Sequence, residues 1–180
     1  MSTATASQDL RFPIGKFHYQ GPYSEPQRRK LIEEIEAAPR ELRAAVARLT
    51  DPQLDTPYRP DGWTVRQVVH HVPESHMNSY IRFKLALTED EPTIKPYNED
   101  AWSRTAEVHG TPLEISLTLL ECLHYRWVAL LRSMTTQEFQ RKFRHPELGP
   151  MDLERALALY AWHGKHHVAH ITSLRKRNGW

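Results

Sequence analysis

Apolar residues recur every three or four positions along four long stretches of this 180-residue chain, and this spacing constrains the fold more than any other feature. A repeat near 3.6 residues places such side chains on one face of an α-helix. The stretches cover residues 24–49, 64–87, 111–134 and 152–177, and we identify no strand pattern between them. Helices with one apolar face bury it against one another, so the chain is predicted to be all-α and to form a four-helix bundle.

Capping residues mark the predicted helix ends. A Ser, Thr or Asp before a helix can accept a hydrogen bond from a free backbone N–H, and a Glu or Gln three residues later can complete a capping box. The start signals are Thr64 with Gln67, Thr111 with Pro112 and Glu114, and Asp152. Asn178 and Gly179 mark the end of the last helix, because glycine readily adopts the left-handed conformation that ends many helices.

Two prolines, Pro39 and Pro73, lie inside the predicted helices. Proline has no backbone N–H, so one hydrogen bond of the helix is missing at each position. We expect a kink or break near Ala38 and a local bend where the carbonyl group of Val69 is free.

The remaining segments set the domain organisation. Residues 1–23 are interrupted by Pro and Gly and are predicted to be an irregular segment that packs on the bundle, with residues 24–180 forming a single four-helix domain. Residues 88–110 make a connection that is unusually long for a compact domain. We therefore expect this connection to cross over the fold or to cover a site.

Composition excludes several classes of function. The 24 basic and 22 acidic residues leave a net charge of +2, which is too balanced to indicate a nucleic-acid surface. The single cysteine, Cys122, excludes a disulfide framework and a thiolate zinc site. No apolar run reaches the ~18 residues of a membrane span, and the polar N-terminus does not resemble a secretory signal. We expect a cytoplasmic protein with no membrane or nucleic-acid partner.

Histidine is the unusual residue of this chain, with 11 copies in 180 residues. Seven of them fall in two windows of the second and fourth predicted helices: His70, His71 and His76, then His163, His166, His167 and His170. At about 100° per residue, three from the fourth helix lie at the centre of its apolar stripe, while His166 lies to one side. Imidazole rings in an apolar core are costly unless each finds a partner.

A divalent metal ion would supply such a partner. His163 and His167 are four residues apart, so their side chains are neighbours on the helix and can bind one ion. Neutral imidazole suits zinc, nickel, copper or iron(II), and bundle-core sites take further ligands from other helices. The third ligand should come from the second helix, where helical phase favours His76 over His71 and His70 without deciding between them.

Four motifs resemble the DinB-like superfamily, more specifically its YfiT-like branch, over nearly the whole chain. They are FPIGKF, DGWTVRQVVHHVPESHMNSYIRFKLALTE, IKPYNEDAW and WHGKHHVAHI. The resemblance implies a four-helix bundle with a long crossover connection and one divalent metal ion per subunit, so residues 24–180 would be a metal-binding domain. It implies His71, His163 and His167 as the ligands, in place of His76, and it implies a homodimer.

Three histidine ligands leave an open position on the ion, which is typical of a catalytic site. We therefore predict a metal-dependent enzyme with a small-molecule substrate, and the family resemblance favours a hydrolase that uses metal-activated water. An alternative is a thiol S-transferase, in which the metal activates a low-molecular-weight thiol of the bacillithiol type as co-substrate. A further alternative is a non-catalytic metal-binding bundle. Zinc is the expected metal, with nickel as the second choice.

Other polar residues are weaker candidates. Glu74, His70 and His170 could act as catalytic acids or bases, and four histidines could orient the ligands or move protons: His70, His76, His166 and His170. Arg66, Arg82 and Lys84 could meet an anionic substrate or could simply be surface charges. Tyr97 and Trp102 could wall the pocket or anchor the long loop to the bundle.

Overall fold

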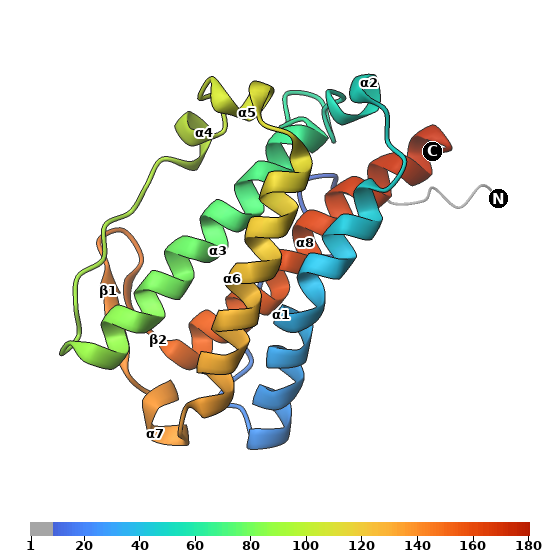
Figure 1. Cartoon of the computed structure of the whole chain (residues 1–180). Coiled ribbons are helices and arrows are strands. Elements are labelled where there is room, and N and C mark those ends of the chain that lie inside the picture. The colour runs from blue at the N-terminus through green and yellow to red at the C-terminus, as the bar shows by residue number, and fades with distance from the viewer. Residues whose placement is uncertain (1–8) are drawn as a thin grey trace.

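The computed structural model describes residues 9–180, so the first eight residues of the predicted irregular segment lie outside the described part. Four long helices form a bundle (Figure 1). They are α1 (Glu25–Val46), α3 (Val65–Thr88), α6 (Leu113–Ser133) and α8 (Leu153–Asn178). The four-helix bundle predicted from the apolar spacing is confirmed.

The helices contact one another around the bundle in the order α1, α6, α3 and α8. Figure 1 shows that α1 and α8 run in one direction, while α3 and α6 run in the other. The neighbours α3 and α6 follow each other in the chain yet are parallel, so the chain must return along the bundle between them. Residues 89–112 make this return and include the single-turn helices α4 (Glu99–Trp102) and α5 (Glu107–Gly110). The predicted long crossover connection is confirmed.

A short β-hairpin corrects the expectation that helices alone build this chain. Strands β1 (Lys142–His145) and β2 (Gly149–Asp152) pair antiparallel where we predicted only a loop. Each strand has four residues, and prolines interrupt the region, so no period-2 pattern can develop. The crossover is hydrogen-bonded to strand β1 of the hairpin, because the N–H of Ile94 donates to the Arg144 carbonyl at 3.0 Å. Single-turn helices α2 (Asp51–Leu54) and α7 (Thr136–Phe139) complete the connections.

Two of the three predicted helix starts have the expected cap. The backbone N–H of Gln67 donates to the Thr64 hydroxyl at 3.1 Å, and that of Arg155 donates to Asp152 at 2.7 Å. The third prediction is wrong, because α6 begins at Leu113 with Pro112 in the cap position and no side-chain cap. The carboxylate of Glu114, which we expected to complete the box, binds Arg43 of α1 instead. At the far end of α8, Gly179 adopts the expected left-handed conformation.

Both internal prolines lie within continuous helices, so the break considered near Ala38 does not occur. In α1 the carbonyl of Ile35, four residues before Pro39, lies 2.6 Å from a ring nitrogen of His124. A side chain of another helix thus replaces the backbone donor that proline lacks.

The apolar core is divided into two clusters by a layer of histidines at mid-height of the bundle. One cluster contains Phe83, Trp127 and Leu157, and the other contains Val68 and Ile171. The side chains between them on three helices include His76 of α3, His124 of α6 and the four histidines 163, 166, 167 and 170 of α8. The predicted inward position of the histidine stripe on α8 is therefore observed.

The described part of the N-terminal segment lies along α8. The ring of Phe17 is 6.0 Å from that of Trp162, and the Tyr19 hydroxyl donates to Glu154 at 2.9 Å. Glu154 also forms a buried ion pair with Arg28 of α1 at 2.9 Å. Within residues 9–180, no helix is long and apolar enough to cross a membrane.

Candidate metal centre

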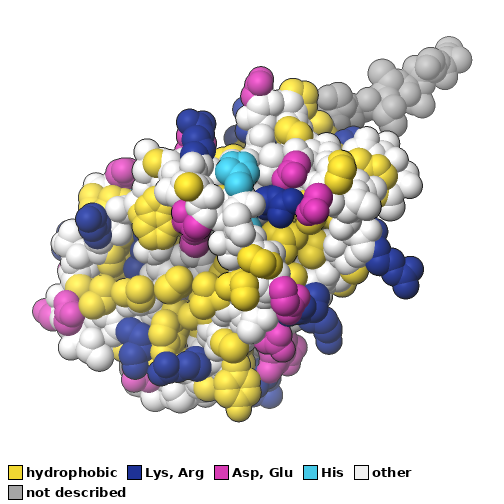
Figure 2. Space-filling view, turned by 45° about the horizontal axis from the view of Figure 1, so that its top comes forward, with side chains coloured by type: hydrophobic (Ala, Val, Ile, Leu, Met, Phe, Trp, Pro, Cys, Tyr) yellow, Lys and Arg dark blue, Asp and Glu magenta, His cyan; other side chains and the backbone are white. Residues whose placement is uncertain are grey.

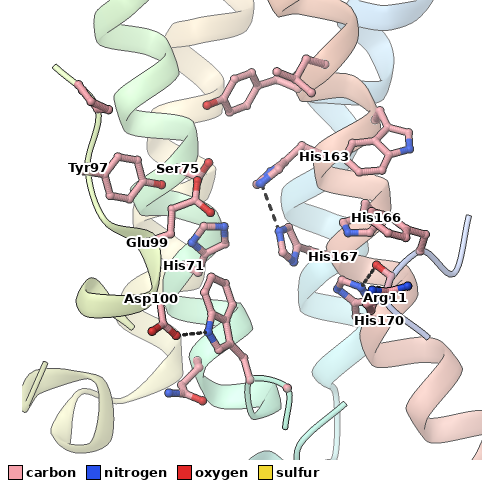
Figure 3. Close-up of a pocket in the computed structure, with 18 of the residues that line it drawn as sticks. Arg11, His71, Ser75, Tyr97, Glu99, Asp100, His163, His166, His167 and His170 are labelled. Carbon is pink, nitrogen blue, oxygen red and sulfur yellow. Dashed lines mark hydrogen bonds between the residues drawn. The ribbon is translucent and has the colours of Figure 1, made fainter. Parts of the chain in front are cut away.

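A cavity of about 870 Å³ opens beside the histidine layer. Its wall includes residues of α3 and α8, of the crossover near α4, and of the β-hairpin. His71 extends from α3, and His163 and His167 extend from α8 on the opposite side (Figure 3). The pocket thus receives ring nitrogens from two helices that are antiparallel neighbours in the bundle.

The three histidines predicted as ligands are brought together. Each offers a ring nitrogen, and these three atoms lie within 4.8 Å of one another. The Nε2 atoms of His163 and His167 are 3.2 Å apart. Two nitrogens at zinc-binding distance and tetrahedral angle would be ~3.3 Å apart, so this pair already has the spacing of two ligands on one ion. The arrangement fits a divalent metal.

Burial keeps these imidazoles neutral. Loss of solvation lowers the pKa of His71 to about 4, and it lowers the pKa values of His163 and His167 well below the ordinary 6.5. Neighbouring histidines lower the last two further. A histidine must be neutral to offer a lone pair to a metal, so the protonation state suits binding.

Helical phase placed His76 correctly in the core but did not identify its partners. The side chain is fully buried, and its Nε2 lies 3.1 Å from His163 Nδ1, on the side of that ring away from His167. Its Nδ1 lies 2.7 Å from Nε2 of His124. His76 therefore contacts the candidate ligand His163 at Nδ1, the nitrogen that does not face His167, while His71 lines the cavity.

Two of the weaker candidates lie outside this cavity. His70 and Glu74 line a separate cavity of about 90 Å³ together with Glu107. The Nδ1 atom of His70 is 2.7 Å from the Ser116 hydroxyl of α6. The geometry gives neither residue access to the three converging nitrogens.

The other two histidines of α8, His166 and His170, line the cavity and pack on aromatic side chains. His170 stacks on Tyr58 with ring centroids 4.0 Å apart, and its Nε2–H donates to the Arg11 carbonyl at 3.1 Å. His166 stacks on Trp162 at 4.3 Å. Both contribute to the lining, and His170 fixes the N-terminal segment over it.

Two acidic residues of α4, Glu99 and Asp100, were missed by the sequence reasoning. Figure 3 shows the Glu99 carboxylate directed into the pocket beside Ser75 and His71. Burial raises the pKa of Glu99, and the charge of Arg82 opposes this rise. Both acids stand in the motif IKPYNEDAW, two and three residues after Tyr97, which we considered for the pocket wall, and that position was the available signal.

Asp100 contacts Trp63, which in turn packs against His71. The Trp63 indole N–H lies 3.4 Å from Asp100 Oδ1, and the indole packs against His71 with ring centroids 4.7 Å apart. This contact limits the orientations open to the His71 ring.

The remaining candidates divide between pocket and surface. Tyr97 and Arg82 line the cavity, and Trp102 packs on Tyr97 with ring centroids 4.5 Å apart. Arg66 instead forms ion pairs with two aspartates near α2, and Lys84 is exposed on α3. Of the three basic residues considered, only Arg82 lines this cavity.

Comparison with known proteins agrees with this geometry. The sequence matches the DinB superfamily over residues 34–171. A protein of Bacillus cereus (strain 03BB102), named "Putative metal-dependent hydrolase", is 57% identical over 172 residues, which are 96% of this chain and 99% of that protein. A protein of the same name from Bacillus anthracis (strain CDC 684) is 56% identical over the same shares.

Solved structures show the same fold. YfiT from Bacillus subtilis, described as a probable metal-dependent hydrolase with an unusual four-helix bundle topology, superimposes with a TM-score of 0.93. The two sequences are 53% identical over 95% of this chain and 98% of that one. TT2238, a four-helix bundle protein, shares the fold alone, with a TM-score of 0.54 and 18% identity over 78% of this chain and 94% of the other.

These matches confirm the resemblance inferred from the four motifs, including the YfiT-like branch. They agree with the observed four-helix bundle, and the names of the relatives describe metal-dependent proteins. The chain belongs to the DinB superfamily.

Proposed function

We propose that this protein is a metal-dependent hydrolase whose ion is held by His71, His163 and His167. The observation that carries the proposal is the convergence of three neutral imidazoles within 4.8 Å of one another on the wall of an open cavity of about 870 Å³. The names of the Bacillus relatives support the same activity. Zinc is the proposed metal and nickel the second choice. Imidazole is a suitable ligand for either ion.

A divalent ion held by three protein ligands would keep an open position, act as a Lewis acid and supply a water that ionises near neutral pH. The chain's own residues provide the rest of the site. The Glu99 carboxylate lies in the pocket beside His71 and is placed to accept a proton from the reacting group. Arg82 supplies positive charge to the same cavity, and Tyr97 and Trp63 wall it.

A thiol S-transferase is the second candidate. The cavity of about 870 Å³ lies near the upper end of the roughly 300–1,000 Å³ of ligand pockets, so it can take either one larger substrate or a thiol of the bacillithiol type with a small electrophile. In this case the thiol would be bound as co-substrate, because the one cysteine, Cys122, is exposed on α6. A third possibility, metal binding without catalysis, needs no substrate.

One set of assays separates the three possibilities. The purified protein is stripped with a chelator, reloaded with zinc or nickel, and its metal content is compared with that of His163→Ala. Activated esters and amides are then offered without thiol, and monochlorobimane is offered with and without bacillithiol. We expect one metal ion per chain, thiol-independent hydrolysis and loss of both in the variant. Conjugation that requires thiol would assign the transferase, and bound metal with neither reaction would assign the non-catalytic protein.

We also propose a homodimer, as the family resemblance implied. Figure 2 shows hydrophobic side chains gathered across the face on which α6 lies, and α6 exposes Ile115, Leu119 and Tyr125. Sedimentation or light scattering would measure the mass in solution, and a monomer at all concentrations would contradict the proposal. The cytoplasmic location stays a prediction, which cell fractionation would test.

A further inference from the structure

A row of three imidazoles, of which His76 and His124 are buried, connects the candidate metal centre to the backbone of α1. His163 Nδ1 lies 3.1 Å from His76 Nε2, and His76 Nδ1 lies 2.7 Å from His124 Nε2. The row ends where His124 Nδ1 lies 2.6 Å from the carbonyl oxygen of Ile35. It therefore crosses from α8 through α3 and α6 to α1 at mid-height of the bundle.

The end of this row depends on a proline. In a regular helix the carbonyl of residue 35 would accept the backbone N–H of residue 39. Pro39 has no N–H, so the carbonyl of Ile35 is free for His124, although α1 continues without a break. A carbonyl oxygen can only accept, and His124 Nδ1 must therefore be the donor.

This fixed end determines the direction of every hydrogen bond in the row. A neutral imidazole has one donor and one acceptor nitrogen, so a donating Nδ1 makes His124 Nε2 an acceptor. His76 must then donate from Nδ1 and accept at Nε2. His163 must donate from Nδ1, which leaves the lone pair on its Nε2. That is the atom 3.2 Å from His167 Nε2, where a metal would be held.

The surroundings keep the two inner rings neutral and immobile. His76 is 0% exposed and His124 is 2% exposed. Both rings meet Trp127 edge to face, with centroids 5.8 Å apart in each pair, and His76 also packs edge to face on Tyr160 at 5.2 Å. A charged imidazole in this apolar region would be costly, and burial correspondingly lowers the pKa of His124 to about 4.

We propose that His76 and His124 are positioning residues which, anchored on the carbonyl freed by Pro39, hold His163 in the tautomer and orientation that present Nε2 to a metal. Histidine ligands are commonly oriented by a partner on their second nitrogen, and here that partner is another histidine supported in turn by a third. The inference rests on the proposed metal site, but the tautomers themselves belong to the metal-free protein.

The first test is nitrogen NMR of the full metal-free chain with labelled histidine, at a pH near 8. Long-range proton–nitrogen spectra distinguish the two neutral tautomers of each ring. We expect the proton on Nδ1 in His124, His76 and His163. A proton on Nε2 of His163 or of His76 would overturn the proposal, whether or not the protein binds metal.

The second test measures zinc affinity by competition with a chromophoric chelator. His124→Leu removes the anchor, and we expect the affinity to fall about tenfold or more, as loss of an outer partner usually costs 10–100-fold. His124→Gln keeps one donor and one acceptor, and we expect it to stay within about threefold of the wild type. Unchanged affinity in folded His124→Leu would contradict the proposal.

His70→Leu is the matched control. His70 is also a buried histidine of α3 bonded to α6, through Ser116, but it lies outside the metal cavity. We expect its affinity to remain within about threefold of the wild type. An equal loss in this variant would show a general effect of core histidines and would contradict the proposal.

Circular dichroism checks that each variant folds, and if His124→Leu does not fold, the NMR result decides. A wild-type chain that binds no zinc contradicts the proposed function, whereas binding with the wrong tautomer contradicts only this inference.

Discussion

Two groups of histidines share the same layer of the bundle but differ in their partners. His76 and His124 are buried in the core, and all four of their ring nitrogens have a hydrogen-bonding partner. His71, His163 and His167 border the cavity, and their nitrogens converge on one another. Among the described residues, the Nδ1 atoms of His71 and His167 are buried without any hydrogen-bond partner.

The difference separates the two core histidines from the three proposed ligands. A buried polar group is costly unless it is bonded, and the core pair meets this cost within the protein. The cavity group meets it only in part, because the Nε2 atoms of His163 and His167 lie at hydrogen-bond distance, 3.2 Å, while the Nδ1 atoms of His71 and His167 have no partner within residues 9–180. Burial alone therefore does not indicate a ligand, whereas three ring nitrogens that converge within 4.8 Å of one another at a cavity wall do.

The largest expected effect comes from removing a ligand from the cavity group. His163→Ala should reduce zinc affinity by more than the 10–100-fold that loss of an outer partner usually costs, and hydrolysis should be lost with the metal. His124→Leu, from the core pair, should reduce affinity only by the smaller amount. Chelator competition on both variants measures the gap. If the two variants lose affinity equally, the distinction between the groups is wrong.

A change at Glu99 should separate metal binding from turnover. Its carboxylate lies in the pocket beside His71 and is proposed to accept a proton (Figure 3). Glu99→Gln should lower kcat/KM by about 10²–10⁴-fold, the usual range for a general base. Zinc affinity should change by less than about threefold, since the amide keeps the shape of the side chain. A large loss of metal in this variant would instead identify Glu99 as a ligand.

Metal binding should also stabilise the fold. A ligand at about 100 times its Kd adds about 2.7 kcal/mol, which corresponds to a rise in Tm of about 5–10 °C for a domain of this size. Calorimetry with and without zinc should show this rise in the wild type and its absence in His163→Ala. An equal rise in that variant would place the ion elsewhere.

The smallest expected effect is a change in acid sensitivity. Burial lowers the pKa of His71, His124, His166 and His170 from about 6.5 to about 4, so the unfolded chain binds more protons between these values. The free energy of unfolding of the metal-free protein should thus be level above pH 6.5 and decrease as the pH falls toward 4.

The core pair contributes to this slope. His124→Gln should reduce the proton uptake on unfolding by about one in that window. Urea titrations at several pH values provide the measurement. A slope that is unchanged in the variant would mean that His124 is not neutral in the folded protein near pH 5.

Much of the fold could be predicted from local patterns. Apolar spacing located the four helices, and Thr64 and Asp152 cap α3 and α8 as expected. The hairpin could not be predicted, because its strands are short and depend on the crossover, which is distant in sequence. The capping box predicted at the start of α6 was wrong. The carboxylate of Glu114, which the sequence pattern assigned to the cap, binds Arg43 of another helix.

The site was only partly accessible from the sequence. Helical phase gives a direction around an axis, and both His71 and His76 point inward from α3. Both contact α8, and only His71 lines the cavity, whose wall includes residues of the crossover that are distant from His71 in sequence. The family resemblance implied His71, while Glu99 lies in the four-residue helix α4, which is too short to show a periodic pattern.

The proposed metal site is tested most directly by a crystal structure of the zinc-loaded protein with anomalous scattering data at the zinc edge. We expect one anomalous peak bonded to ring nitrogens of His71, His163 and His167 at about 2.0–2.1 Å, with Nε2 as the metal-binding atom of His163. A peak bonded to His76 or His124, or no peak at this position, would contradict it.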